Sequence, residues 1–334
     1  MRSPRDSGAA SSLPPLRCAF GHLFRFANKS GCRADNAKDL LRICRFPLGR
    51  WKRWLPYLRE SDVLGPATFQ HKVLRRYVGG FAWPTIALAV GTWAVFLFAM
   101  FALNQGWLSG WGMVAIAVVC NFYSFTVLHE AVHENIEGKS RGGWLTEVMG
   151  WSSGAMFMAP FQAFRVVHLT HHQNTNKPDL DPDYWVASRH FLVTLLRCLT
   201  IYPHYIQSYL FKIDRQGKSI KLDLTFLLLY WGAALGTLCT PYWNLSLYGF
   251  ILPTFLGTGV QAIFFDWFPH HPHQETSQKL NTRNVPGRIL HILMAGQNVH
   301  QLHHVNPRVP FYRYHEAFKA AVLPADQAEN QAIT

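Results

Sequence analysis

The chain has 334 residues, of which 49% are hydrophobic, 14% are aromatic and only 15% are charged. A soluble domain carries about 25% charged residues, and this composition excludes a disordered chain, a collagen-like chain and a coiled coil. The formal net charge of +13 is concentrated in residues 1–80, which contain 16 Lys or Arg and 5 Asp or Glu.

Residues 1–80 are predicted to form a basic, partly disordered N-terminal arm. Within it, residues 51–55 (Trp-Lys-Arg-Trp-Leu) mix basic and aromatic side chains, a pattern typical of an interfacial segment on an anionic membrane surface. A nucleic-acid patch is the rival interpretation, but no nucleic-acid motif accompanies it, so we expect no nucleic-acid partner. The first 40 residues fit a targeting extension, a disordered arm or an over-long start of the reading frame.

Two long stretches, residues 81–128 and 224–265, contain no charged residue. Each is long enough for two membrane-spanning helices of about 20 residues. They are interrupted by turn-forming residues at 104–106 and 241–244. We therefore predict an all-α integral membrane protein with four transmembrane helices in two hairpins, 81–103 with 107–128 and 224–240 with 245–265. Buried helices of a large soluble core are the alternative, but such a core rarely needs uncharged stretches of this length.

The positive-inside rule orients these helices. The hairpin tips carry no charge, whereas the N-terminal arm, the 129–223 loop and the C-terminal tail are charged. Both termini and the central loop are therefore predicted on the cytoplasmic side of the membrane. We divide the chain into the arm, a membrane domain over 81–318 and a tail over 319–334. The six cysteines form no CxxC pair and predict no disulfide framework.

Histidine is clustered beyond the predicted spans. One group follows the second span, one lies in the central loop, one follows the fourth span and one lies in the tail. Residues three and four apart share a helix face, so each group can direct two or three imidazoles to one place. The groups are His129 and His133; His168, His171 and His172; His270, His271 and His273; and His300, His303 and His304.

This spacing predicts a metal site on the cytoplasmic side. Imidazole suits Zn, Cu, Fe and Ni, and a zinc ion takes about four ligands. The HxxxH group and the two HxxHH groups supply too many histidines for one ion and about enough for two, which points to paired iron and O₂ chemistry. Residues 129–133 also match the HExxH helix of zinc proteases, with Asp266 as a third ligand, but that alternative leaves both HxxHH groups unused. A haem site would need histidines inside the bilayer.

The three histidine boxes around two membrane hairpins resemble the membrane fatty-acid desaturase/hydroxylase superfamily over roughly residues 80–318. The segments 264–270 (FFDWFPH) and 296–300 (GQNVH), with the Asn/Asp/Pro-rich stretch after His172, look most like the carotenoid β-ring hydroxylases. The resemblance implies two non-haem irons that activate O₂ to break a C–H bond. It implies nine metal ligands: His129, His133, His168, His171, His172, His270, His300, His303 and His304.

The resemblance also implies roles for other groups. Asp266 would help to hold a metal-bound water, and Glu130, where those hydroxylases often have Asp, would orient a ligand histidine. Asp179, Asp181 and Asp183 fit either a similar orienting role or a solvated loop. Electrons would come from an external donor such as ferredoxin and its reductase, because no cytochrome b5-like segment is visible.

The substrate is expected to be lipidic, either an acyl chain or a carotenoid, held beside membrane lipid. Desaturation and hydroxylation are both compatible with this scaffold, and oxidative decarboxylation of a free fatty acid to a terminal alkene is a further alternative. The aromatic residues of the second and fourth spans would line such a slot, and the alternative for each of them singly is a lipid-facing or packing role. These are Tyr123, Phe125, Tyr248, Phe250, Phe264 and Phe265.

Overall fold

The computed structural model describes residues 67–138, 142–214, 219–278, 280–285 and 287–322. Within these ranges the regular elements are helices, and two isolated bridges are the only β-type pairings. The prediction of an all-α chain is therefore confirmed for the described part. The predicted interfacial segment at 51–55 lies outside it.

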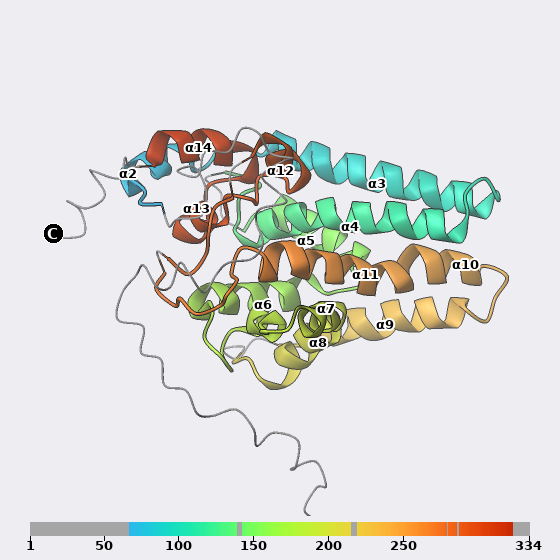
Figure 1. The fold of residues 1–334 in the computed structure, drawn as a ribbon. Coiled ribbons are helices and arrows are strands. Elements are labelled where there is room, and N and C mark those ends of the chain that lie inside the picture. Colours follow the sequence, from blue (N-terminus) through green and yellow to red (C-terminus); the bar gives the residue numbers. More distant parts are fainter. Residues whose placement is uncertain (1–66, 139–141, 215–218, 279, 286, 323–334) are drawn as a thin grey trace, which may run out of the picture. The chain divides into compact units, whose positions relative to one another are not determined.

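The first hairpin consists of α3 (Trp83–Asn104) and α4 (Gly110–Val132), which lie side by side (Figure 1). Gly106, with a φ of +74°, forms the tight turn between them, a conformation that glycine adopts without steric cost. Ser109 then caps α4, because its Oγ accepts a hydrogen bond of 3.1 Å from the Gly112 N–H. The buried side chains of the two helices belong to one hydrophobic core.

A third long helix runs from Trp243 to Trp267. It consists of α10 (Trp243–Ser246), the π-helical turn η5 (Leu247–Ile251), α11 (Leu252–Gln261) and the π-helical turn η6 (Ala262–Trp267). Gly249 lets it approach α3 closely, since a Cβ there would lie 2.5 Å from the Sδ of Met100. Its neighbour α9 (Lys221–Thr237) precedes it in the chain.

Three helices of the described chain are long and apolar enough to cross a membrane: α3, α4 and Trp243–Trp267. They correspond to three of the four predicted spans. The segment predicted as the fourth, 224–240, falls on α9, which has 17 residues. At 1.5 Å per residue α9 is about 25 Å long, shorter than a hydrocarbon core of about 30 Å. The structure therefore supports three spans, and the fourth stays a prediction.

A group of shorter helices connects these long helices. They are α5 (Trp144–Met156), α6 (Phe161–Asn174), the 3₁₀ turn η4 (Pro182–Val186), α7 (Phe191–Leu199) and α8 (Ile201–Phe211). Helix α5 packs on α4, and α6 packs on α8 and η4. These contacts bring α6, which carries the second histidine group, next to the end of α4.

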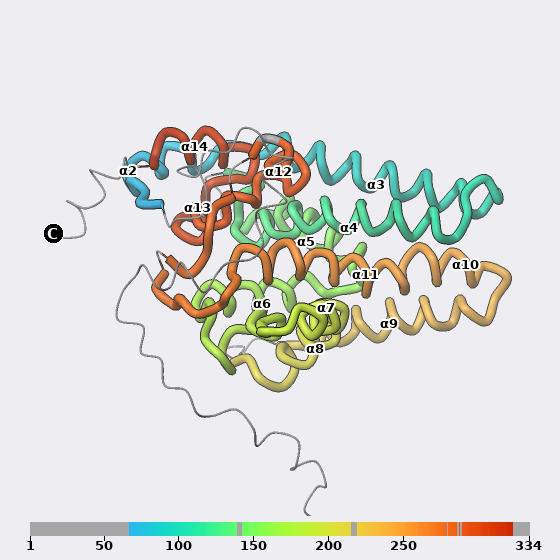
Figure 2. The backbone as a smooth tube through the Cα atoms, viewed as in Figure 1, coloured from blue at the N-terminus to red at the C-terminus, as the bar shows by residue number. Residues whose placement is uncertain are grey.

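The C-terminal elements are α12 (Arg288–Leu293), α13 (His300–Val305), η7 (Phe311–Arg313) and α14 (Tyr314–Ala321). Helix α14 packs on α2 (His71–Leu74), which is followed by the turn η3 (Arg75–Tyr77), so the two ends of the described chain lie side by side (Figure 2). The Gln70 N–H donates a hydrogen bond of 2.8 Å to the carbonyl of Ala321. Residues 67–80, placed in the N-terminal arm by sequence, thus belong to the folded unit around α13.

Candidate metal centre

Nine histidines lie together in two clusters between α4, α6, α13 and the segment after η6. Within each cluster, one ring nitrogen of each histidine lies within 4.8 Å of those of the others. Cluster A contains His129, His133, His168, His172 and His303. Cluster B contains His171, His270, His300 and His304. These are the nine residues named from the sequence, so the structure brings all of them together.

Helix geometry explains how the boxes divide between the clusters. In each box the residues four apart share a helix face and enter the same cluster: His168 with His172 in cluster A, and His300 with His304 in cluster B. The histidine three residues after the first one of the box enters the opposite cluster: His171 enters cluster B, and His303 enters cluster A. In each adjacent pair, His171–His172 and His303–His304, one residue therefore enters cluster A and the other enters cluster B, so one HxxHH box contributes to both clusters.

The Nε2 atoms of cluster A converge too closely for hydrogen bonds to satisfy them. Four separations are 3.0 or 3.1 Å: His129–His303, His133–His168, His168–His172 and His172–His303. Each imidazole nitrogen has one lone pair or one hydrogen, so at most two of these four contacts can be hydrogen bonds. A metal ion that accepts all five lone pairs satisfies every one of them.

The same separations bear on the coordination number. With metal–nitrogen bonds of about 2.1 Å, ligands at right angles lie about 3.0 Å apart, whereas tetrahedral ligands lie about 3.4 Å apart. Cluster A therefore fits an ion with five or six ligands better than a four-coordinate zinc ion.

Cluster B also contains buried nitrogens without a protein partner. Both ring nitrogens of His270 and the Nδ1 of His300 are buried and make no hydrogen bond. The Nε2 of His304 lies 3.1 Å from that of His300 and 3.4 Å from that of His171. Buried polar atoms are rarely left unpaired, so the orphaned nitrogens of His270 fit a ligand role in a second metal site.

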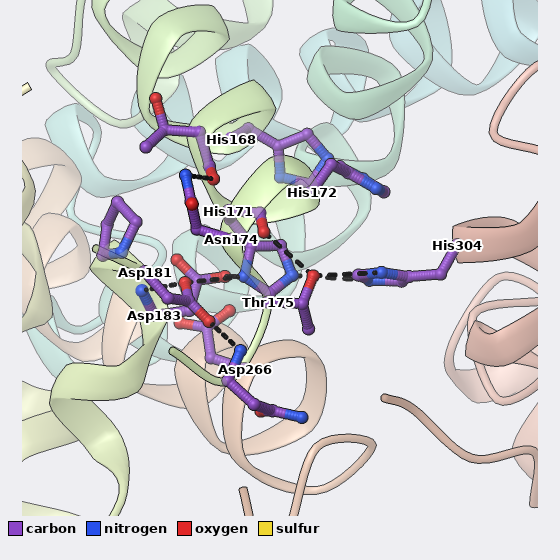
Figure 3. Close-up of polar contacts among 12 residues, drawn as sticks. His168, His171, His172, Asn174, Thr175, Asp181, Asp183, Asp266 and His304 are labelled. Carbon is purple, nitrogen blue, oxygen red and sulfur yellow. Dashed lines mark hydrogen bonds and ion pairs between the residues drawn. The ribbon is translucent and has the colours of Figure 1, made fainter. Parts of the chain in front are cut away.

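Two carboxylates hold His171 in one orientation. Its Nδ1 lies 2.9 Å from Asp181 Oδ1 and 3.2 Å from Asp183 Oδ2, and Figure 3 shows the aspartates on the side of the ring away from His304. The Nδ1–H is therefore the donor, which leaves the Nε2 lone pair for a metal. Burial alone would lower the pKa of His171, but Asp183 and Asp181 outweigh it and raise the pKa to about 9.

Asp181 is itself fixed by the backbone. Its carboxylate accepts hydrogen bonds from the N–H groups of Asn176 and Asp183, at 2.7 and 2.9 Å. Burial raises the pKa of Asp183 to about 6, against the lowering effect of His171. The sequence left open whether this loop is solvated, and the structure places Asp181 and Asp183 in the interior beside a candidate ligand.

Neutral groups support other histidines of both clusters. The Nδ1 of His303 lies 2.9 Å from the hydroxyl of the buried Tyr314, the first residue of α14. The Nδ1 of His129 lies 3.4 Å from Gln297 Nε2, and that of His304 lies 3.5 Å from Thr175 Oγ1. Sequence reasoning missed these three partners, because each comes from a segment whose position depends on tertiary packing.

Glu130 and Asp266, which the family resemblance assigned to orienting a histidine and holding a water, lie behind the clustered histidines. Glu130 Oε1 lies 4.0 Å from His129 Nδ1 and accepts a hydrogen bond of 3.3 Å from the Phe311 N–H. Asp266 Oδ2 lies 3.0 Å from the hydroxyl of Tyr205, which also lies 2.6 Å from Asp183 Oδ1. A chain of contacts thus links Asp266 through Tyr205 and Asp183 to His171.

Most of the clustered histidines outside the membrane-spanning helices have lowered pKa values. Burial is the largest cause, and the charges of the neighbouring imidazoles add to it. The pKa lies well below 6.5 for His133, His168, His172, His270, His300, His303 and His304. Neutral imidazole is the form that binds a metal, so burial prepares these side chains as ligands.

An apolar cavity of about 60 Å³ lies beside cluster A. Two of its wall residues stack on candidate ligands: Phe125 on His129 and Phe164 on His168, with ring centroids 5.8 and 5.5 Å apart. Its polar groups come from Tyr202, Tyr205, Thr258, Gln261 and Asp266. Of the six aromatic residues expected to line a slot, only Phe125 lines this cavity.

Comparison with known proteins agrees with this arrangement. Residues 105–333 match the family model for fatty acid desaturases, and this range contains both clusters. The chain belongs to the fatty acid desaturase family. This family assignment supports an oxidoreductase of the desaturase/hydroxylase type in a membrane.

One relative of this desaturase-family chain is the dihydrorhizobitoxine desaturase of Bradyrhizobium elkanii. The two proteins are 24% identical over 221 residues, which covers 58% of this chain and 62% of the relative. The match thus spans less than two thirds of the relative's length. This relative is itself a desaturase, in agreement with the family model.

Proposed function

We propose that the chain is an O₂-dependent oxidoreductase that uses two non-haem iron ions to activate a C–H bond of a lipidic hydrocarbon. The observation that carries the proposal is the convergence of nine histidines, eight of them buried, into two adjacent clusters of five and four. An all-nitrogen ligand set suits iron, and the spacing in cluster A suits more than four ligands. Two irons there would supply the reductive activation of O₂ that an unactivated C–H bond requires.

The zinc-protease alternative gains no support from the geometry. A protease site on residues 129–133 would need Asp266 as the third ligand beside His129 and His133. Asp266 instead contacts Tyr205 and does not belong to cluster A. Three further histidines occupy the positions around His129 and His133, and a protease would have no use for cluster B.

The chain's own residues hold and orient the site. Asp181 and Asp183 fix the ring of His171, and Tyr314 fixes that of His303. These contacts fix the ring orientations that metal binding would require.

The cavity lined by Phe125 and Phe164 positions the substrate. Its apolar wall excludes water and would place a hydrocarbon against the rings of Phe125 and Phe164, which stack on His129 and His168. We propose an acyl chain as the substrate, to be desaturated or hydroxylated. A carotenoid ring, or a free fatty acid that loses its carboxylate to give a terminal alkene, is the alternative substrate.

The reaction needs two electrons and two protons for each O₂ reduced to water alongside the oxidised substrate. We propose that an external one-electron carrier such as ferredoxin, with its reductase, supplies the electrons. We further propose that α9 completes a fourth span and that both termini and the two clusters lie on the cytoplasmic side. The charge-free hairpin tips and the basic N-terminal residues favour this orientation.

Product analysis tests the proposal. The chain would be expressed in a host that makes β-carotene, beside a His171→Ala variant, and the acyl chains, carotenoids and volatile hydrocarbons would be profiled by mass spectrometry. New unsaturated or hydroxylated acyl chains that the variant lacks would establish the acyl substrate. New hydroxylated carotenoids or a terminal alkene would select one of the alternatives. An assay with dihydrorhizobitoxine itself would show whether the relative's substrate is shared, and identical profiles in all tests would contradict the proposal.

A further inference from the structure

Helix α7 exposes its large apolar side chains and buries its polar ones, the reverse of a helix on the surface of a water-soluble protein. Leu192 and Leu196 are 73% and 64% exposed, whereas Thr194 and Cys198 are 1% and 0% exposed. Phe191, Val193 and Leu199 are exposed as well. A helix that faces water buries its large apolar side chains, so this pattern indicates that the outer face of α7 contacts something apolar.

The one charged side chain of α7 does not interrupt that face. Arg197 donates a hydrogen bond of 2.6 Å to the carbonyl of Ala187, and its guanidinium lies over the ring of Trp185. Thr194 likewise turns inward and donates a hydrogen bond of 3.3 Å to the carbonyl of Val186. The polar groups of the helix are therefore satisfied within the protein, and the outer face is uniformly apolar.

The two ends of α7 contact the third spanning helix through the parts of Phe191 and Leu199 that are not exposed. A Cβ at Gly259 of α11 would lie 3.1 Å from Leu199 Cδ2, so the glycine allows close approach. The rings of Phe191 and Trp267 lie 5.9 Å apart. Helix α7 is thus attached to the Gly259–Trp267 end of this helix, the end from which the chain continues to His270 and cluster B.

The direction of α7 fits a place at the membrane surface. Figure 1 shows α7 almost end-on, whereas α3, α4, α9 and α11 run lengthwise across the picture. A helix perpendicular to spanning helices lies in the plane of the membrane. Its outer apolar face continues the surface of the spanning helix on which it packs.

Helix α14 shows that the chain follows the usual pattern elsewhere. It buries Tyr314, Ala317 and Ala321 and exposes Glu316 and Lys319. The reversed pattern of α7 is therefore local to the segment beside the spanning helices.

We infer that α7 is an interfacial helix whose outer apolar face is inserted into the acyl-chain region of the bilayer leaflet nearer the histidine clusters. Lipid is the occupant that the position favours, because the face adjoins a spanning helix and lies parallel to the membrane plane. Helix α8, which follows α7 directly, forms one wall of the cavity beside cluster A through Ile201, Tyr202 and Tyr205. The membrane surface thus extends to the helix that directly precedes this wall of the cavity.

Spin-label accessibility in liposomes tests the inference independently of catalysis. Nitroxide labels would be placed singly at Leu192 and Leu196, in a full-length background whose own cysteines are replaced and whose thermal unfolding is unchanged. Controls would be Leu97 in α3 for the bilayer, Lys319 in α14 for water, and Thr194 for the buried face of α7. Collision rates with O₂, which partitions into lipid, and with a water-soluble nickel chelate would be measured for each label.

Labels at Leu192 and Leu196 are expected to resemble the label at Leu97, with a ratio of oxygen to nickel collisions several-fold above that at Lys319. A ratio equal to that at Lys319 would place α7 in water and overturn the inference. Low collision rates with both reagents, as expected at Thr194, would mean that a second copy or another segment of the chain covers α7. Two independent label positions on the exposed face guard against a local disturbance by either label.

Discussion

Clusters A and B differ in what stands behind their histidines. In cluster A, His303 and His129 have the neutral partners Tyr314 and Gln297 within hydrogen-bond distance, and the carboxylate of Glu130 lies beyond hydrogen-bond distance, 4.0 Å from His129 Nδ1. In cluster B, His171 is held by the two carboxylates of Asp181 and Asp183. An anionic partner makes an imidazole a stronger electron donor and stabilises positive charge at the metal. The difference teaches that the two sites, although built from one kind of ligand, are electronically unequal.

Adjacent histidines offer the sharpest test of the two-cluster assignment, with the largest expected effect. His303→Ala should remove a ligand of cluster A, and His304→Ala should remove a ligand of cluster B. Each variant is expected to lose activity and about half of the bound metal, because each site depends on its own ligands. Metal analysis of the purified variants checks this. Loss of all metal in one variant and of none in the other would contradict the assignment of His303 and His304 to separate sites.

The pH dependence of the metal-free chain should separate His171 from the other clustered histidines, because His270, His300 and His304 of cluster B share the lowered pKa values of cluster A. In cluster A, His133, His168, His172 and His303 have pKa values well below 6.5. Below pH 6.5 the unfolded chain binds protons that the folded chain cannot. The free energy of unfolding should therefore fall with falling pH by up to about 1.4 kcal/mol per pH unit for each histidine.

His171 of cluster B should act in the opposite direction. Its pKa is raised to about 9, so its contribution is complete below pH 6.5 and is lost as the pH rises through 9, on the order of 3 kcal/mol. Thermal unfolding of the chelated chain in detergent, scanned from pH 5 to 9.5, should show a maximum near neutral pH. The metal-loaded chain is the control and should be less sensitive to acid near pH 6. A metal-free melting temperature that rises steadily toward pH 5 would contradict the buried neutral histidines.

Removing the carboxylate support tests the anionic side of the comparison. Asp181→Asn should weaken metal binding at cluster B by about 10- to 100-fold, because His171 loses a charged partner. Asp179→Asn is the matched control: it lies exposed in the same loop at a φ of +67°, which Asn also adopts. Metal titration followed by calorimetry measures both variants. Equal affinities would show that Asp181 does not support the ligand.

A smaller effect is expected on the neutral side. Tyr314→Phe removes the hydroxyl partner of the His303 Nδ1 and should lower the free energy of unfolding by about 1–3 kcal/mol. Denaturant unfolding, with the partly exposed Tyr312→Phe as a control, measures the change. A loss of cluster B metal alone would contradict the placement of His303 in cluster A.

Glu130→Gln should have the smallest effect. Its Oε1 accepts a hydrogen bond from the Phe311 N–H, and Gln retains an acceptor oxygen. Substantial activity and full metal content are therefore expected, as measured by product formation and metal analysis. Complete loss of oxidase activity with retained zinc-dependent proteolysis would instead restore the protease alternative.

The sequence predicted the helices and ligands that depend on local spacing. Three of the four predicted spans match helices of sufficient length and apolarity, because an uncharged stretch of about 20 residues identifies a span without tertiary information. The i, i+3 and i+4 spacing of the histidine boxes likewise identified eight of the nine clustered residues, and the family resemblance added His270. Their role as metal ligands remains the prediction that the variants above test.

The cavity beside cluster A was harder to predict. The aromatic residues of the second and fourth spans were expected to line a slot, yet Phe265 stacks on Phe125 behind the cavity wall and Tyr248 packs near Trp111 and Trp243. Much of the wall comes instead from α8, through residues such as Tyr202 and Tyr205. The walls of a cavity are faces of several helices that meet only when the helices pack together. The amino-acid composition of one span therefore does not identify the residues that line the cavity.

The sequence by itself thus determined the helical class, the membrane character and the set of clustered histidines, because charge-free length and helical periodicity are properties of contiguous residues. Only the tertiary structure decided which histidine enters which cluster, which of Asp179, Asp181 and Asp183 turns inward, and that Tyr314 and Tyr205 stand behind the site. Those contacts join residues that are distant in the chain, and their geometry is set by the packing of whole helices against one another.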